Sequence, residues 1–176
     1  MDIKIQKEDE YIEYINNHIT NVKKAYENLR SIETELMARV PEINYSNLHN
    51  TYQRIIVHDA SKFSDEEFDA YRRHFHSIND AEKKDSEEDF KEAWKHHYVY
   101  NDHHPEHFNG KEMFPKEAVL EMICDWIAMG YNGKPTLSAY DWYYQNKDKD
   151  DTLKDMNKNT VELVEKILDV VHKYLD

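Results

Sequence analysis

The chain has 176 residues with 36 acidic and 23 basic side chains, so its formal net charge is −13 with histidine neutral. That balance argues against sequence-independent binding of nucleic acid, in which cations of the protein must replace the counterions of the phosphate backbone. The longest unbroken apolar run, residues 126–129, is far shorter than the roughly 20 residues of a membrane-spanning helix. We therefore expect no membrane partner, and the single Cys124 favours a reducing cytoplasm.

Long segments with apolar residues at a period near 3.6, together with few glycines and prolines, predict an all-α fold. We expect one helical domain over residues 1–176. The predicted helices, in chain order, are residues 7–39, 46–59, 64–77, 86–101, 115–130, 136–145 and a last helix whose apolar stripe runs from Val161 to Leu175. Ser64 and Glu67 have the spacing of a capping box at the start of the third helix. The charged segment 79–89 is predicted to be a loop.

His18 lies within the apolar stripe of the first predicted helix, between Ile15 and Val22. A buried imidazole needs a partner, because an unsatisfied polar group in the core is costly. His18 is therefore either a hydrogen-bonded core histidine or a metal ligand.

The doublet His58-Asp59 stands at the predicted end of the second helix. Consecutive helical residues point about 100° apart, so both side chains reach one ion only where the helix ends or distorts. Imidazole and carboxylate together suit Zn, Mn or Fe. In the alternative reading, Asp59 caps a helix and His58 interacts with the negative end of the helix dipole.

Five histidines occur within residues 96–107. His97 and His104 are seven residues apart and would share one helix face, as would His96 and His103. We expect one member of each adjacent pair to point inward as a ligand or an acid/base group. His107 is the expected bystander, and the alternative is a set of surface histidines.

Asp125 borders the apolar stripe of the helix predicted over 115–130, whereas Glu117 and Glu121 are expected to face further away. A carboxylate at a core margin needs a cation nearby, which could be a metal ion or a basic side chain. Cys124 shows no paired base and carries no nucleophile role. The aromatic residues within 140–144 are expected to pack in the core; the alternatives are that they form the floor of a pocket or stack a base.

Taken in order, His18, His58-Asp59, the histidine cluster and Asp125 resemble the pattern of the HD-domain superfamily of metal-dependent phosphohydrolases. Closer similarity is to DUF5662, a family of small bacterial and phage proteins, over most of residues 50–165. The matching segments are HDASKFSDEEFDAYRRHF (58–75), AWKHHYVYNDHHPEHF (93–108) and PKEAVLEMICDWIAMG (115–130).

The HD resemblance implies a helical bundle that holds one or two divalent transition ions, namely Mn, Fe, Zn or Co. The implied ligands of the first ion are His18, His58, Asp59 and Asp125, and those of the second are His97 and His104, with Asp59 as a bridge. Asp59 and Lys62 would be the catalytic residues, and Lys62 would face the phosphate of a small phosphorylated substrate, such as a nucleotide.

Lys62 also marks a departure, because the simplest HD nucleotidases have a glutamate three residues after the doublet. Two further functions fit the same residues. One is a non-enzymatic binding or regulatory protein on a metal-stabilised scaffold, and the other is an HD-type di-iron oxygenase.

Overall fold

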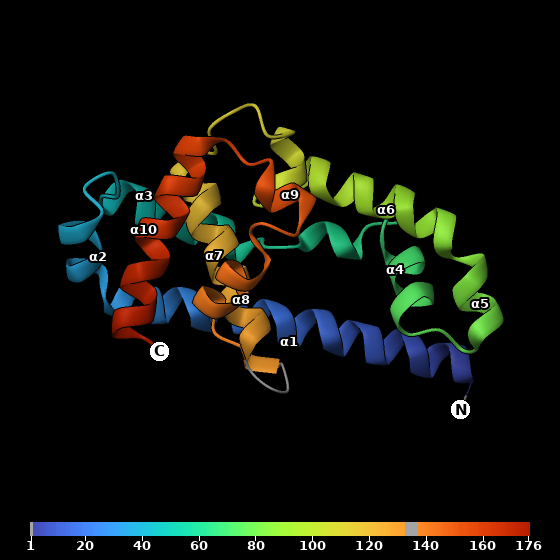
Figure 1. The fold of residues 1–176 in the computed structure, drawn as a ribbon. Coiled ribbons are helices and arrows are strands. Elements are labelled where there is room, and N and C mark those ends of the chain that lie inside the picture. Colours follow the sequence, from blue (N-terminus) through green and yellow to red (C-terminus); the bar gives the residue numbers. More distant parts are fainter. Residues whose placement is uncertain (1, 133–136) are drawn as a thin grey trace. The chain divides into compact units, whose positions relative to one another are not determined.

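The computed structural model describes residues 2–132 and 137–176, and no strand occurs among them. The predicted all-α fold is therefore confirmed. The helices of these residues (Figure 1) are α1 (Ile3–Ser31), α2 (Glu33–Arg39), α3 (Tyr45–Ile56), η1 (Ala60–Phe63), α4 (Phe68–Phe75), α5 (Asp80–Asp85), α6 (Glu87–Tyr100), η2 (Pro105–Phe108), α7 (Lys116–Asn132), α8 (Ala139–Asn146), α9 (Asp151–Lys154) and α10 (Lys158–Tyr174). Within the described ranges, no helix has both the length and the apolar character that crossing a membrane requires.

The chain divides into two compact units. The first unit comprises residues 1–19 and 59–101, and the second comprises residues 20–58 and 102–176. Each unit has a hydrophobic core of its own. The expected single domain over 1–176 stays a prediction.

In the first unit, α4 packs on α5 and α6. Its core consists of Tyr11, Ile15, Ala70, Tyr71 and Ala93.

A buried cation connects α4 to the segment that follows it in the first unit. Arg72 is 1% exposed, and its guanidinium donates to both carboxylate oxygens of Glu82 at 2.8 and 2.9 Å. Asn79 caps α5 by accepting a hydrogen bond from the Glu82 amide. These contacts explain why a segment predicted as loop forms a helix, since they supply the stability that its apolar content lacks.

In the second unit, α7 packs on α3, α8 and α10, and Figure 1 shows α10 running beside α7. The second half of α1 contributes an apolar stripe that includes Val22, Ala25 and Leu29, all fully buried. The predicted stripe of the last helix is confirmed, because Val164, Ile167, Leu168 and Val171 are buried. Val161 and Leu175, at its two ends, are half-buried and pack against the same core. This core holds α7, the helix that carries Asp125.

Several helix boundaries differ from the predictions. The first predicted helix is two helices, because Ile32 leaves helical geometry at φ −113° and ψ 21°. The third begins at Phe68, so the capping box predicted for Ser64 and Glu67 is wrong. Thr136, the predicted start of the sixth helix, lies outside the described residues.

The N-terminus of α3 offers a test of local stability. Asn44 accepts a hydrogen bond from the Asn47 amide, and the Asn47 side chain accepts one from the Asn44 amide. Removing such a cap costs about 1 kcal/mol. We expect Asn44→Ala to lower the free energy of unfolding in urea by about that amount, whereas Ser46→Ala, at an exposed position, changes it little. Equal stability of the two variants would contradict the capping role.

Candidate functional site

The doublet His58-Asp59 follows the end of α3, as predicted. The amides of Val57 and His58 donate back to the carbonyls of Arg54 and Ile55, and Asp59 then adopts the left-handed conformation with φ 55°. Aspartate tolerates this conformation better than most residues. The Asp59 side chain makes no capping hydrogen bond, so the alternative role as a helix cap is not observed.

In the first unit, two histidines face the carboxylate of Asp59. His18 Nε2 lies 3.5 Å from Asp59 Oδ2, and His97 Nε2 lies 3.3 Å from Asp59 Oδ1. All three side chains are at least 95% buried. An ion at about 2.0–2.2 Å from each ligand atom can bridge atoms that are separated by up to about 4 Å. The spacing of both pairs is therefore compatible with a shared metal ion.

Glu67 stands behind His97 in the same unit. It is fully buried, and its two oxygens lie 2.7 Å from His96 Nδ1 and 2.8 Å from His97 Nδ1. Burial raises the pKa of Glu67, but the hydrogen bonds and charge of His97, together with His96, outweigh it and lower the pKa. A carboxylate on Nδ1 fixes the proton there and leaves Nε2 as a ligand atom. Glu67 thus directs Nε2 of His97 to Asp59.

Of the adjacent histidines 96 and 97, His97 is the one whose side chain faces Asp59. The His96 ring packs against Tyr100, with ring centroids 4.4 Å apart. We call the set His18, Asp59, Lys62, Glu67 and His97 the Asp59 cluster.

Lys62 is the cation of the Asp59 cluster. Its ammonium lies 2.6 Å from Asp59 Oδ2, and its side chain is 14% exposed. It also lies 5.8 Å from the centre of the Tyr71 ring. Lys62 therefore neutralises the oxygen that also faces His18, and its predicted contact with substrate phosphate stays a prediction.

In the second unit, the partner of His58 is the carboxylate of Glu121, which was expected to face away from the core. His58 Nδ1 lies 2.9 Å from Glu121 Oε1, and its Nε2 lies 4.0 Å from Asp125 Oδ1. His103 Nδ1 lies 3.3 Å from the same Glu121 oxygen, with its ring 4.5 Å from that of His58. His58, His103 and Glu121 are buried, and each offers a ligand atom within 4.8 Å of the others. We call these residues, with Asp125, the His58 cluster.

Glu121 is the buried member of the His58 cluster that sequence reasoning missed. It is only 4% exposed, so the expectation that it faces away from the core is wrong. Burial raises its pKa, but His103 and His58 outweigh that effect and hold the pKa far below its usual range. Arg54 Nε donates to its other oxygen at 2.7 Å and also pairs with Asp102. A signal was present, because residues 121 and 125 are four apart and share a helix face.

His104, the remaining predicted ligand, and two residues that were not expected to bind metal lie in the second unit. His104 is half-buried, and its ring lies 4.2 Å from that of His103. The ring of His107, the expected bystander, packs on Phe108. Cys124 is buried, and burial is the main reason why the pKa of its thiol is raised. The negative charges of Glu121 and Asp125 raise this pKa further. The structure thus groups His18, Asp59 and His97 in the first unit and His58 and Asp125 in the second.

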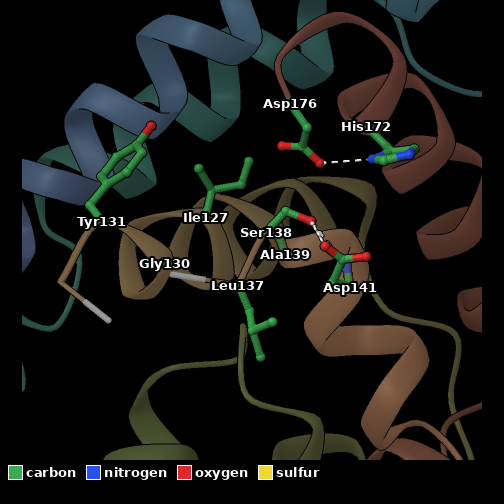
Figure 2. Close-up of a pocket in the computed structure, with 9 residues that line it drawn as sticks. All are labelled: Ile127, Gly130, Tyr131, Leu137, Ser138, Ala139, Asp141, His172 and Asp176. Atoms are coloured by element: carbon green, nitrogen blue, oxygen red, sulfur yellow. Dashed lines mark hydrogen bonds and ion pairs between the residues drawn. The ribbon is translucent and has the colours of Figure 1, made fainter. Parts of the chain in front are cut away.

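A cavity of about 470 Å³ also lies in the second unit, and none of the predicted ligands lines it. Figure 2 shows its wall, where His172 pairs with Asp176 and Ser138 with Asp141. The cavity is lined by Ile127, Gly130, Tyr131, Leu137, Ser138, Ala139, Asp141, His172 and Asp176. Of the aromatic residues within 140–144, Tyr143 is buried and stacks on Trp126, as expected, whereas Tyr144 is exposed.

A family model described as a family of unknown function, DUF5662, matches residues 7–170. The chain belongs to this family. The matched range contains every residue of the Asp59 cluster and the His58 cluster. No curated protein and no solved structure matches the chain. The resemblance of this DUF5662 protein to HD-domain enzymes stays a prediction from the sequence.

The titration of His97 gives a prediction for the metal-free protein. Burial lowers its pKa, but hydrogen bonds to Asp59 and Glu67 outweigh burial and raise it. Protonated His97 therefore stabilises the folded state below its unfolded pKa of about 6.5, and this contribution is lost as the pH rises through the raised, folded-state pKa.

We expect the stability difference between the chelator-treated natural protein and His97→Gln to shrink from about pH 6 to about pH 8 in urea unfolding. A difference that is independent of pH would contradict the assignment. Because the neutral imidazole is the metal-binding form, metal affinity should increase over the same interval.

Proposed function

We propose that this DUF5662 protein is a metal-dependent phosphohydrolase of the HD type that acts on a nucleotide or another small phosphoester. The observation that carries the proposal is the environment of Asp59. Each oxygen of this buried carboxylate faces an imidazole Nε2, and the Nδ1 of one of these imidazoles is held by a second buried carboxylate, Glu67. That combination is typical of histidines that bind metals.

The donor set fits a divalent transition ion. Imidazole and carboxylate ligands suit Mn, Fe, Co and Zn. Within the first unit, His18, Asp59 and His97 would hold such an ion, and within the second unit His58 and Asp125 offer ligands of the same types. When bound, such an ion would lower the pKa of a coordinated water from 15.7 to about 7 and so make hydroxide available at neutral pH.

The chain's own residues would prepare this chemistry. Glu67 and Glu121 keep a proton on Nδ1 of His97 and His58, which leaves both Nε2 atoms available to the metal. Lys62, which neutralises Asp59 in the structure, would turn its charge to a phosphoryl oxygen of the substrate as a point charge.

The buried single cysteine supports an assignment to a reducing cytoplasm.

The test is phosphate release by tag-free protein with metal added back, against mono-, tri- and cyclic nucleotides. We expect turnover of at least one class, and its loss in Asp59→Asn. Protein that binds metal but is silent with all three classes would contradict hydrolysis of nucleotides and favour the binding or regulatory function. Bound iron with an oxygen-dependent optical change would favour the oxygenase.

A further inference from the structure

Tyr11 carries a buried polar group that the fold does not use. Its side chain is fully buried in the core of the first unit, with its ring 5.2 Å from that of Phe68 and 5.6 Å from that of His76. Within the described part of the chain, its hydroxyl has no hydrogen-bond partner. Buried hydroxyls normally have one, as Tyr26 does by donating to the Leu48 carbonyl at 2.7 Å. The Tyr11 hydroxyl therefore requires an explanation beyond packing.

The position of Tyr11 places it beside the Asp59 cluster. Tyr11 precedes His18 by seven residues on α1, so the two side chains share a helix face about two turns apart. Its ring contacts Phe68, the residue after Glu67. The same core contains Tyr71, whose ring lies 5.8 Å from that of His97.

The electrostatic environment of Tyr11 keeps its proton in place. Burial raises the pKa of the phenol most, and the charges of Glu67 and Asp59 raise it further. The hydroxyl is therefore a neutral hydrogen-bond donor at physiological pH. Both Glu67 oxygens already have a histidine nitrogen as partner, so Glu67 does not serve as the acceptor for Tyr11. The Tyr11 hydroxyl could therefore donate to an acceptor atom of a bound ligand.

We propose that the Tyr11 hydroxyl donates a hydrogen bond to a phosphoryl oxygen of the bound substrate. Tyr11 would then be a phosphate-binding residue beside the Asp59 cluster. This inference rests on the proposed function. A phosphoryl oxygen on a metal ion is a strong acceptor, and charge-assisted hydrogen bonds are the stronger ones. A neutral donor also adds no positive charge that would compete with the metal for Asp59.

The experiment compares two tyrosine-to-phenylalanine substitutions, at Tyr11 and at Tyr26, each of which removes one hydroxyl group. In metal-loaded full-length protein, Tyr11→Phe should bind inorganic phosphate at least tenfold more weakly by calorimetry, with unchanged metal content and an unchanged or higher melting temperature. Tyr26→Phe is the matched control, because it loses a hydrogen bond within the second unit. It should melt at a lower temperature and bind phosphate as the natural protein does.

The outcomes separate this inference from the proposed function. If the natural protein binds phosphate and Tyr11→Phe binds it equally well, the Tyr11 inference is overturned and the phosphohydrolase proposal stands. Loss of metal from Tyr11→Phe would also overturn the inference, since the hydroxyl would then act on the metal ligands. If the metal-loaded natural protein binds no phosphate, both proposals fail.

Discussion

Replacing Asp59 with asparagine should weaken metal binding at least 100-fold. In the natural protein, one carboxylate oxygen of Asp59 faces His18 and the other faces His97. Asparagine removes the negative charge but has nearly the same shape as aspartate. Loss of an outer carboxylate partner alone costs about 10–100-fold in metal affinity, so loss of the central ligand should cost more. Asparagine also tolerates the left-handed backbone at φ 55°, so the fold should persist. Elemental analysis and a metal titration measure the effect.

His49→Ala is the control for Asp59→Asn. His49 is exposed on α3, so its loss should leave the metal stoichiometry unchanged. A protein in which Asp59→Asn and His49→Ala retain metal equally would show that Asp59 binds no ion. The metal site proposed here would then be wrong.

Replacing Glu121 with glutamine should reduce both stability and metal affinity. Glu121 is the common partner of His58, His103 and Arg54 inside the second unit. Removing one member of a buried charged network typically costs about 3–5 kcal/mol, because the remaining groups stay buried without compensation. Glutamine has one acceptor oxygen and no charge, so it cannot accept from Arg54 and both histidines and holds the Nδ1 proton of His58 less strongly. Metal affinity should therefore fall about 10–100-fold as well. Urea unfolding and a metal titration report the two effects separately.

Glu117→Gln provides the comparison, because Glu117 lies one turn earlier on α7 and accepts a hydrogen bond from the Asn47 side chain. Its loss should cost about 1 kcal/mol and leave metal affinity unchanged. If Glu121→Gln behaves like Glu117→Gln in both measurements, the orienting role of Glu121 is refuted.

Local sequence signals predicted much of the fold because they report on backbone geometry. The period of the apolar residues located the long helices, including the buried stripe of α10. The position of His58-Asp59 at a helix end was also readable, since the pattern of α3 stops there. The short helix α5 could not be predicted from its own sequence, because it depends on the contact of Glu82 with Arg72 from another helix.

The choice among candidate ligands depended on contacts that sequence spacing does not contain. Spacing allowed either His96 or His97 to face inward, and Glu67, which lies 29 and 30 residues earlier in the chain, decides the orientation of both rings. Glu121 was placed outward because the stripe of α7 was drawn from that helix alone. Arg54 and His103 cover this face, so a carboxylate can be buried there.

Anomalous diffraction from crystals grown with added Mn²⁺ would show whether Asp59 binds an ion. We expect an anomalous peak at the Asp59 cluster, with Asp59 oxygen and histidine Nε2 atoms at about 2.0–2.2 Å from it and the Lys62 ammonium displaced from Asp59. A fully loaded crystal with no peak there, and with Lys62 still paired to Asp59, would show that this cluster is not a metal site.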